Sequence, residues 1–359
     1  MTHAGERGRC CLAKTNTQVL IIGAGPAGTA TAIQCAAVGL DVTIVEREPF
    51  PRHRPGESLH PGVDCLFARL DVAEAIACAG FPRHEGHWLS WAGKRRFEAY
   101  GRDAQGPWQG FQAWRADLDQ ILLQRAVALG TQVLQPCRCI APLTHGGRLA
   151  GLTTSSGAIT ASYIVDASGG SHWLARHIGL AVVKESPRLI ARYGYARGDL
   201  KLRNRMPSLV SSRHGWTWTA MVQRGVYHWT RLNLDGKTSA RPPHQFRGLM
   251  LDGSVRSADV TWRRIMRPAG PGYFLAGDAA MVLDPASSHG VLRAVMSGMM
   301  AGHLIVGTIQ HRSSPAEAAS WYCGWLHQWF EHDQTQLKAS YAQLPNPPDW
   351  VRDASHVLA

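Results

Sequence analysis

Apolar and polar positions near the start of the chain follow the order strand, turn, helix, strand. Residues 19–22 are four consecutive apolar residues, which is typical of a strand buried on both faces. A glycine-rich turn follows at once, and the small and apolar residues of 26–38 predict a helix that ends at Gly39. Residues 41–46 predict a second buried strand that ends in an acid. This is the order of a parallel strand–helix–strand unit.

Further along the chain, helical and strand-like patterns form separate blocks. Apolar residues at three- and four-residue spacing predict an amphipathic helix that starts within 114–119 and ends at Gly130. Residues 290–309 predict a buried helix, and Ser314 with Glu317 predicts a capped start for a final helix. Shorter helices are predicted at 61–70 and 72–79, strands within 86–100, 131–163, 188–234 and 272–276, and loop with helix at 235–258.

These blocks predict an α/β protein with a strand-rich (α+β) insert. We expect one cofactor-binding domain built from discontinuous pieces and a β-rich substrate domain lying over it. The boundaries are 17–80, 112–180 and 255–310 for the first domain, 81–111 and 181–254 for the second, and 311–359 for a C-terminal helix and tail.

Composition limits the class of protein. The chain has 359 residues, of which 45% are hydrophobic, enough for a large core. Residues 290–309 are interrupted by Arg293 and His303, so we expect no stable membrane insertion, and residues 1–17 lack the apolar core of a signal peptide. None of the eight cysteines forms a CxxC pair, which predicts reduced thiols, a cytoplasmic protein and no metal site.

The net charge of +12 comes from dispersed basic residues. Small clusters occur at 94–96, 201–205 and 263–264, without a long basic run. We interpret the excess first as a solvated basic surface and second as attraction for an acidic partner or substrate; nucleic acid is not expected.

The glycine turn has the spacing of a dinucleotide-binding fingerprint. Gly23 allows a tight turn, Gly25 lets a phosphate approach the backbone, and Gly28 lets the helix pack close to the strand. Pro26 suits an early helical position. Glu46, at the end of the second strand, can accept hydrogen bonds from both ribose hydroxyls and would repel a 2′-phosphate, which favours FAD or NAD over NADP.

Two later segments complete a set of three. The first is Asp166–Ser171, followed by Arg176, and the second is Gly277–Asp278, followed by Asp284–Pro285. Their order, spacing and strand contexts resemble the FAD-dependent monooxygenases of the para-hydroxybenzoate hydroxylase fold. The resemblance implies a Rossmann-like FAD-binding domain with a β-sheet substrate domain, FAD as cofactor, and NADH or another reductant as electron source.

The resemblance also assigns roles to residues. Asp278 would bond to the ribityl chain, Arg115 would lie along the flavin side of the cofactor, and Asp166 with Gly169 would lie near the pyrophosphate. The predicted cofactor-binding set is Gly23, Gly25, Pro26, Ala27, Gly28, Glu46, Arg47, Arg54, Ser58, Arg115, Asp166, Gly169, Gly277, Asp278, Gly290 and Val291. Arg52 and Arg54 could contact the pyrophosphate or belong to a solvated face.

Candidate catalytic residues lie near the start of the 290–309 helix. The helix N-terminus favours an anion, and a reduced flavin carries negative charge at its N1–C2=O edge, so Pro285 and His289 would lie beside it. His289 could instead be a loop histidine bonded to backbone. Glu57 is the third candidate, with a helix-start cap as the alternative. Trp216 and Trp218 share one strand face and could contact substrate or pack in the core.

Three segments narrow the branch of the superfamily. Arg54–Ser58, the stretch after Gly290, and Trp216-Thr-Trp218 resemble the branch of tryptophan halogenases and geranylgeranyl reductases. Several features depart from halogenases. Thr219-Ala-Met follows Trp218 where those enzymes have Ile-Pro, Ser288-His-Gly replaces their Ser-Thr-Gly, and Lys94 is the nearest but poorly placed counterpart of their lysine.

The compact flavoproteins that mature cysteine tryptophylquinone-dependent amine oxidases fit the chain better. We therefore expect an FAD-dependent monooxygenase that oxygenates an aromatic substrate such as indole or tryptophan, or a tryptophan of a partner protein. The alternatives are a flavin-dependent halogenase, a geranylgeranyl-reductase-like oxidoreductase, and a non-catalytic flavoprotein assembly partner.

Overall fold

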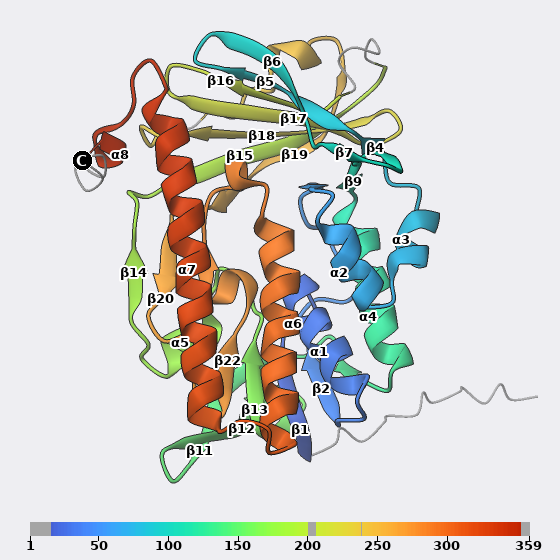
Figure 1. Ribbon diagram of the computed structural model, residues 1–359, viewed down its shortest axis with the longest axis vertical. Coiled ribbons are helices and arrows are strands. Elements are labelled where there is room, and N and C mark those ends of the chain that lie inside the picture. Colours follow the sequence, from blue (N-terminus) through green and yellow to red (C-terminus); the bar gives the residue numbers. More distant parts are fainter. Residues whose placement is uncertain (1–15, 200–205, 238, 353–359) are drawn as a thin grey trace, which may run out of the picture.

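The computed structural model describes residues 16–199, 206–237 and 239–352 (Figure 1). The expectations for the N-terminal segment, for the basic cluster at 201–205 and for the end of the tail lie outside the described residues. The described chain forms a lower part, in which helices pack on a mixed sheet, and an upper layer of mostly antiparallel strands (Figure 1). This arrangement confirms the predicted α/β fold with a strand-rich insert.

The lower sheet brings the three predicted segments to one edge. Its parallel strands are β10 (Gln132–Leu134), β2 (Val42–Val45), β1 (Asn16–Ile22), β13 (Gly157–Asp166) and β22 (Tyr273–Leu275). Ile22 pairs with both Val45 and Asp166, and Asp166 pairs with Leu275. Because the carboxyl ends of parallel strands lie at the same edge, the turns that follow β1, β13 and β22 lie next to one another. Strands β12 (Arg148–Thr154), β11 (Cys139–His145) and β21 (Ala269–Gly270) complete the sheet.

Helix α1 (Pro26–Ala36) packs directly against α6 (Gly290–Ile309). A Cβ atom on Gly298 would lie 2.2 Å from the carbonyl oxygen of Ala27, so only glycine permits this approach. The Thr31 hydroxyl donates to the Gly298 carbonyl over 2.9 Å. The glycine turn and the loop before α6 are therefore held at a fixed separation. The bounds predicted for α6 are confirmed.

The remaining helices surround these two. Helix α4 (Arg115–Ala128) packs on α1, and the long α7 (Pro315–Ala342) runs from the lower sheet to the upper layer (Figure 1). The capping box of Ser314 and Glu317 is present, as predicted. The shorter helices are α2 (Val63–Arg69), α3 (Ala73–Cys78), α5 (Trp173–His177) and α8 (Asp349–Arg352).

The upper layer is a seven-stranded sheet with the order β19, β15, β18, β17, β16, β5, β6. Both predicted inserts supply strands to it, although the division into domains stays a prediction. The strands are β5 (Gly86–Trp91), β6 (Lys94–Ala99), β15 (Ile190–Arg197), β16 (Ser208–Ser211), β17 (Gly215–Gln223), β18 (Val226–Asn233) and β19 (Met250–Asp259).

The interpretation of residues 235–258 as loop and helix is wrong for 250–258, because β19 occupies 250–259; the described residues before it are loop with one helical turn, η2 (His244–Phe246). Strand β19 lies at the edge of the sheet and most of its side chains are exposed, so it lacks the alternating apolar signal of a half-buried strand.

Small sheets connect the two layers. Strand β3 (Glu57–Leu59) pairs with β9 (Gly110–Ala113), which also pairs with β4 (Arg83–His84). Strands β14 (Val182–Lys184), β20 (Arg263–Ile265) and β23 (Met281–Val282) form a second small sheet, and β7 (Arg102–Asp103) pairs with β8 (Gly106–Pro107). Two 3-10 turns, η3 (Gly277–Ala279) and η4 (Pro285–Ser287), follow β22 and precede α6.

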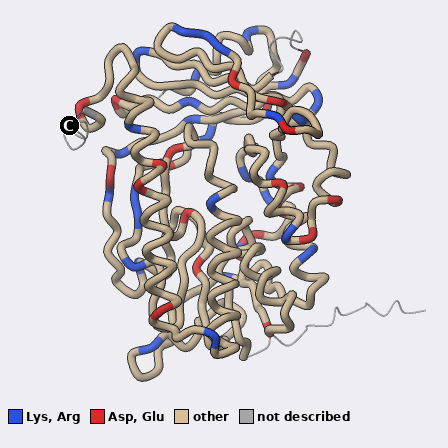
Figure 2. Tube along the Cα trace, viewed as in Figure 1, with Lys and Arg blue, Asp and Glu red and all other residues tan. Residues whose placement is uncertain are grey.

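Among the described residues, α6 is the one helix that is long and apolar enough by composition to cross a membrane. In this fold it packs on α1, and its Arg293 side chain is buried and paired with Asp333. Lysines and arginines are scattered over both layers (Figure 2), as the dispersed charge of the sequence predicts.

Candidate active site

The three glycines of the turn after β1 are required for different reasons. Gly23 has φ +96°, and a Cβ there would lie 2.6 Å from the carbonyl oxygen of Ala167. A Cβ on Gly28 would lie 2.0 Å from the Gly23 oxygen. At Gly25, by contrast, an added Cβ would meet only Nη2 of Arg52, at 3.2 Å. Gly23 and Gly28 are thus fixed by packing, and Gly25 keeps an open approach to the backbone.

A cavity of about 490 Å³ opens beside this turn. Glu46, Gly23 and Gly25 line it, together with Ser168 and Ser171 from the turn after β13. The buried Glu46 carboxylate accepts hydrogen bonds from the backbone N–H groups of Ala24 (2.8 Å) and Glu48 (2.9 Å). A carboxylate has about four acceptor sites in all, so Glu46 can still accept from ribose hydroxyls.

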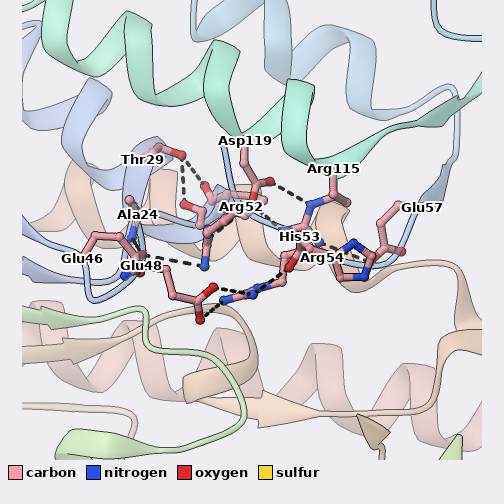
Figure 3. Close-up of polar contacts among 12 residues, drawn as sticks. Ala24, Thr29, Glu46, Glu48, Arg52, His53, Arg54, Glu57, Arg115 and Asp119 are labelled. Atoms are coloured by element: carbon pink, nitrogen blue, oxygen red, sulfur yellow. Dashed lines mark hydrogen bonds and ion pairs between the residues drawn. The ribbon is translucent and has the colours of Figure 1, made fainter. Parts of the chain in front are cut away.

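A chain of alternating charges runs from Glu46 towards Glu57 (Figure 3). Arg52, whose side chain is 8% exposed, lies 3.7 Å from Glu46 Oε2 and 3.3 Å from Asp119 Oδ2. Arg115, at the start of α4, donates from Nε to Asp119 Oδ1 over 2.8 Å and from Nη1 to Glu57 Oε1 over 3.3 Å. Burial opposes the charge of Arg115, but the nearby carboxylates, led by Asp119, outweigh it and raise its pKa.

Arg52 provides the test of whether this site fits an FAD diphosphate. Its Nε is buried without a hydrogen-bond partner, and burial lowers the pKa of its guanidinium despite the nearby Glu46 and Asp119. A diphosphate against Gly25 would supply an acceptor to this arginine, and guanidinium groups bind phosphate oxygens well. The residues present therefore fit the phosphates of a dinucleotide.

Two of the three arginines in the predicted cofactor set, Arg47 and Arg54, do not reach the glycine turn as Arg52 does. Both line the cavity, but Arg47 is largely exposed beside Glu48. Arg54 makes two hydrogen bonds to Glu48, of 3.0 and 3.1 Å. The arginine that lies at Gly25 is Arg52, for which the sequence allowed either a contact with the pyrophosphate or a place on a solvated face.

The side chain of Asp166 is bonded to the backbone of the turn after β13. Its Oδ1 accepts from the Ser168 N–H (2.9 Å) and its Oδ2 from the Leu174 N–H (2.8 Å), with no exposed surface. Burial raises the pKa of this carboxyl. Asp166 therefore shapes the turn and the start of α5, while Ser168 and Ser171 line the cavity. Gly169 has φ +75° within this turn.

The turn after β22 packs on both helices. Gly277 has φ +61° and donates its N–H to the Ser297 hydroxyl over 2.8 Å, and a Cβ on it would lie 3.2 Å from the Ala27 Cβ. Asp278 is exposed beside Glu57 and Arg115. Burial raises the pKa of Glu57 to about 7; Arg115 opposes this shift and Asp278 adds to it.

A second cavity, of about 370 Å³, lies between the loop that precedes α6, residues 285–289, and the upper sheet. The structure brings together here all the residues predicted for catalysis and substrate. Its lining includes Glu57, Ser58, Pro285, His289, Trp216 and Trp218. The Ser58 hydroxyl donates to Gln112 Oε1 over 2.7 Å. Gly290 and Val291 follow directly, at the start of α6.

The imidazole ring of His289 is hydrogen-bonded to a carboxylate, and not to the backbone of the loop. Its Nδ1 lies 3.1 Å from both oxygens of Asp333, on α7. Arg293, one turn further along α6, donates from Nη1 to Asp333 Oδ2 over 3.1 Å. The side chains of Asp333 and Arg293 are only 2% and 5% exposed. Sequence reasoning missed Asp333, because nothing in the pattern of α7 pairs it with a residue 44 positions earlier.

Trp216 is a buried wall of the cavity, 1% exposed, and its Nε1 donates to the Tyr341 hydroxyl over 2.8 Å. Tyr341 in turn donates to Asp284 Oδ2 over 2.7 Å, and Trp262 donates to the same oxygen over 3.0 Å. Asp284 precedes Pro285, so this network fixes the loop beside the predicted flavin edge. Trp218 is half-buried and lines the cavity.

Lys94 lies exposed at the start of β6, and no described lysine lines the second cavity. Within the described part of the chain, no cluster of histidine, cysteine and acidic residues could hold a metal ion. The lining of this cavity is instead aromatic and histidine-rich, and it includes the half-buried carboxyl of Glu57.

Comparison with known proteins identifies the family. A family described as an FAD binding domain matches residues 16–215, and the chain belongs to this family. A tryptophan 2-halogenase from Chondromyces crocatus is 28% identical over 339 residues, which cover 86% of this chain and 64% of that relative. The chain thus spans about two thirds of the length of this relative.

Solved structures share the fold. CmlS, described as a flavin-dependent halogenase, has a TM-score of 0.83 at 23% identity and covers 94% of this chain and 67% of its own. QhpG, described as a peptidyl tryptophan dihydroxylase essential for tryptophylquinone cofactor biogenesis, has a TM-score of 0.72 at 19% identity and covers 94% of this chain and 78% of its own.

The chain is therefore a member of an FAD-binding family, with FAD as its cofactor, and it is similar to flavin-dependent halogenases in sequence and in fold. The diphosphate of FAD would be held by Gly25 and Arg52, and its adenosine ribose by Glu46. The ribityl chain and flavin, which lead to the second cavity, would be held by Asp278 and Arg115. When bound, FAD supplies the redox chemistry, while the protein orients the reactants and excludes water.

Proposed function

We propose that this protein is a flavin-dependent halogenase that acts on an electron-rich aromatic ring. The observation that carries the proposal is the likeness to the tryptophan 2-halogenase across 86% of the chain. Relatives described as halogenases favour halogenation over the oxygenation that the departures in the sequence predict.

The start of α6 supports a halide beside the second cavity. The first N–H groups of a helix have no partner within the helix, and the helix dipole favours an anion there. Gly290 is exposed at this position, and Pro285 to His289 line the cavity next to it. A halide at this loop would lie close to the aromatic ring of a substrate bound in the cavity that Trp216 and Trp218 line.

Oxygenation of an aromatic ring is the second candidate. The resemblance to halogenases assigns the transfer of the halogen to a lysine. Since no described lysine lines the second cavity, its lining favours oxygenation. Under either candidate, the substrate is a small aromatic molecule or a tryptophan of a partner protein. A cytoplasmic location belongs to the same proposal, and the six described cysteines are free thiols.

One experiment separates the two candidates. The FAD-loaded protein is supplied with NADH and a flavin reductase, O2 and bromide, and offered free tryptophan, indole, a phenol and tryptophan-containing peptides. Mass spectrometry of the products should show the isotope doublet of bromine. A product that gains oxygen alone would replace halogenation by oxygenation, and unchanged substrates throughout would contradict both. The Gly25→Ala variant, which should hold little FAD, serves as the control for cofactor dependence.

A further inference from the structure

The second cavity contains an imidazole whose orientation is set by a buried ion pair. His289 Nδ1 faces both oxygens of Asp333 at 3.1 Å, and Arg293 holds the same carboxylate from α6 at 3.1 Å. His289 lines the cavity. The described residues offer no hydrogen-bond partner to its Nε2, which lies on the opposite side of the ring from Nδ1. This nitrogen is therefore left for a ligand in the cavity.

The charge of Asp333 selects one tautomer of the imidazole. Burial opposes ionisation of Asp333, but the hydrogen bond from His289 and the charges around it outweigh burial and hold its pKa below the usual value. An ionised carboxylate only accepts hydrogen bonds, so Nδ1 carries the proton and neutral His289 presents a lone pair at Nε2. The titratable and charged groups that act on this pair are Arg293 on α6, His332 on α7 and His60 after β3.

We propose that His289, oriented by Asp333, is the base that accepts the ring proton when the aromatic substrate is substituted. The inference rests on the proposed function, which supplies the halogen electrophile. The electrophile, hypohalous acid, forms a bond from its halogen to a ring carbon with a pair of ring electrons, and its halogen–oxygen bond breaks to release hydroxide. The C–H bond of that carbon then breaks, and its electron pair restores the aromatic ring. The proton passes to Nε2, and the imidazolium is stabilised by Asp333 before the proton leaves to solvent.

The position of the pair His289–Asp333 suits this step better than that of Glu57, another ionisable side chain in the lining of the cavity. Glu57 is bonded to Arg115 at 3.3 Å and belongs to the chain of charges that leads to the cofactor phosphates. His289 instead begins the helix beside the loop 285–288 and shares the cavity with Trp218. Asp333 contacts the imidazole and is a positioning residue.

Substrate deuterated at the reacting ring carbon tests the role directly. In the wild type, loss of the ring proton should be fast and the isotope effect on kcat small. In His289→Gln, kcat should fall by about 100- to 10,000-fold, the usual contribution of a positioned base, and a clear isotope effect should appear because proton loss limits the rate. The matched control is His303→Gln, an exposed histidine on the same helix, which should retain the wild-type kcat and isotope effect.

A second measurement does not depend on turnover. Nitrogen-15 spectra of the imidazole in the FAD-loaded protein should show a protonated Nδ1 and a bare Nε2, and Asp333→Asn should mix the two tautomers. A His289→Gln variant with wild-type kcat and no isotope effect, or a protonated Nε2 in the neutral wild type, overturns the role. A wild type that makes no substituted product overturns the proposed function and this role together, whereas an active wild type with an unaffected variant overturns the role alone.

Discussion

The open approach at Gly25 allows a sharp test of the cofactor site. In Gly25→Ala the new methyl group would meet only Arg52 Nη2, at 3.2 Å, which is the far end of a side chain that can move by a few tenths of an ångström. The apoprotein should therefore fold with nearly unchanged stability. The same methyl group occupies the space where a phosphate must approach the backbone, so the loss should fall on FAD affinity.

The size of the loss follows from the hydrogen bonds that can no longer form. A hydrogen bond to a charged group contributes about 1.5–3 kcal/mol, so each bond lost from the diphosphate should weaken FAD binding by roughly 10- to 150-fold. Quenching of flavin fluorescence during titration of the apoprotein measures the Kd, and thermal unfolding measures stability. Wild-type affinity in a folded Gly25→Ala variant would refute the placement of the diphosphate.

Two other glycines provide matched controls. Gly324→Ala lies within α7, where an added Cβ meets nothing within 4 Å, and should change neither affinity nor fold. Gly28→Ala places its Cβ 2.0 Å from a backbone oxygen, so it should lose the fold itself and not affinity alone.

Three further predictions concern the residues between the two cavities. Asp278→Ala should weaken FAD binding by about 0.5–1.5 kcal/mol through loss of one hydrogen bond, measured by the same titration; an unchanged Kd would remove Asp278 from the cofactor site. Burial raises the pKa of Glu57 to about 7, whereas the ordinary pKa of a glutamate is 4.5. Between these pH values the folded protein keeps a proton on Glu57 that the unfolded chain has released. Wild-type apoprotein should therefore lose stability relative to Glu57→Gln as pH rises between these values, and a Tm difference that is constant with pH would contradict this. Tyr341→Phe should cost about 1–3 kcal/mol in urea unfolding because the Trp216 N–H and the Asp284 carboxylate lose a buried partner, whereas wild-type stability would mean that the network relaxes.

The elements predicted best from sequence are those with local signals. The glycine spacing places α1, the apolar run places α6, and the capping box places the start of α7. The cavity residues Glu57 and His289 were also predicted, because motifs carried them. Strand β19 was missed because an exposed edge strand has no apolar alternation to detect.

The contacts that the sequence could not predict join residues far apart along the chain. His289 and Asp333 are 44 positions apart, Asp284 and Tyr341 are 57 apart, and Trp216 and Tyr341 are 125 apart. No local sequence pattern links such pairs, because they form only when α7 packs beside the second cavity in the folded chain.

The choice between arginines has a similar origin. Arg52 and Arg54 lie two positions apart in one loop, and only the packing of that loop on α4 brings Arg52 to Asp119 and leaves Arg54 with Glu48. The place expected for Asp166, near the pyrophosphate, stays a prediction; its side chain accepts from the backbone N–H groups of Ser168 and Leu174.

A crystal structure of the FAD complex soaked in bromide, with data collected at the bromine absorption edge, tests the central claim most directly. The account predicts the diphosphate at Gly25 and Arg52, the flavin ring beside Glu57 and Pro285, and an anomalous bromide peak next to the first turn of α6 in the second cavity. FAD bound elsewhere would contradict the site. A flavin in place with no bromide in that cavity would contradict halogenation as the function of this protein.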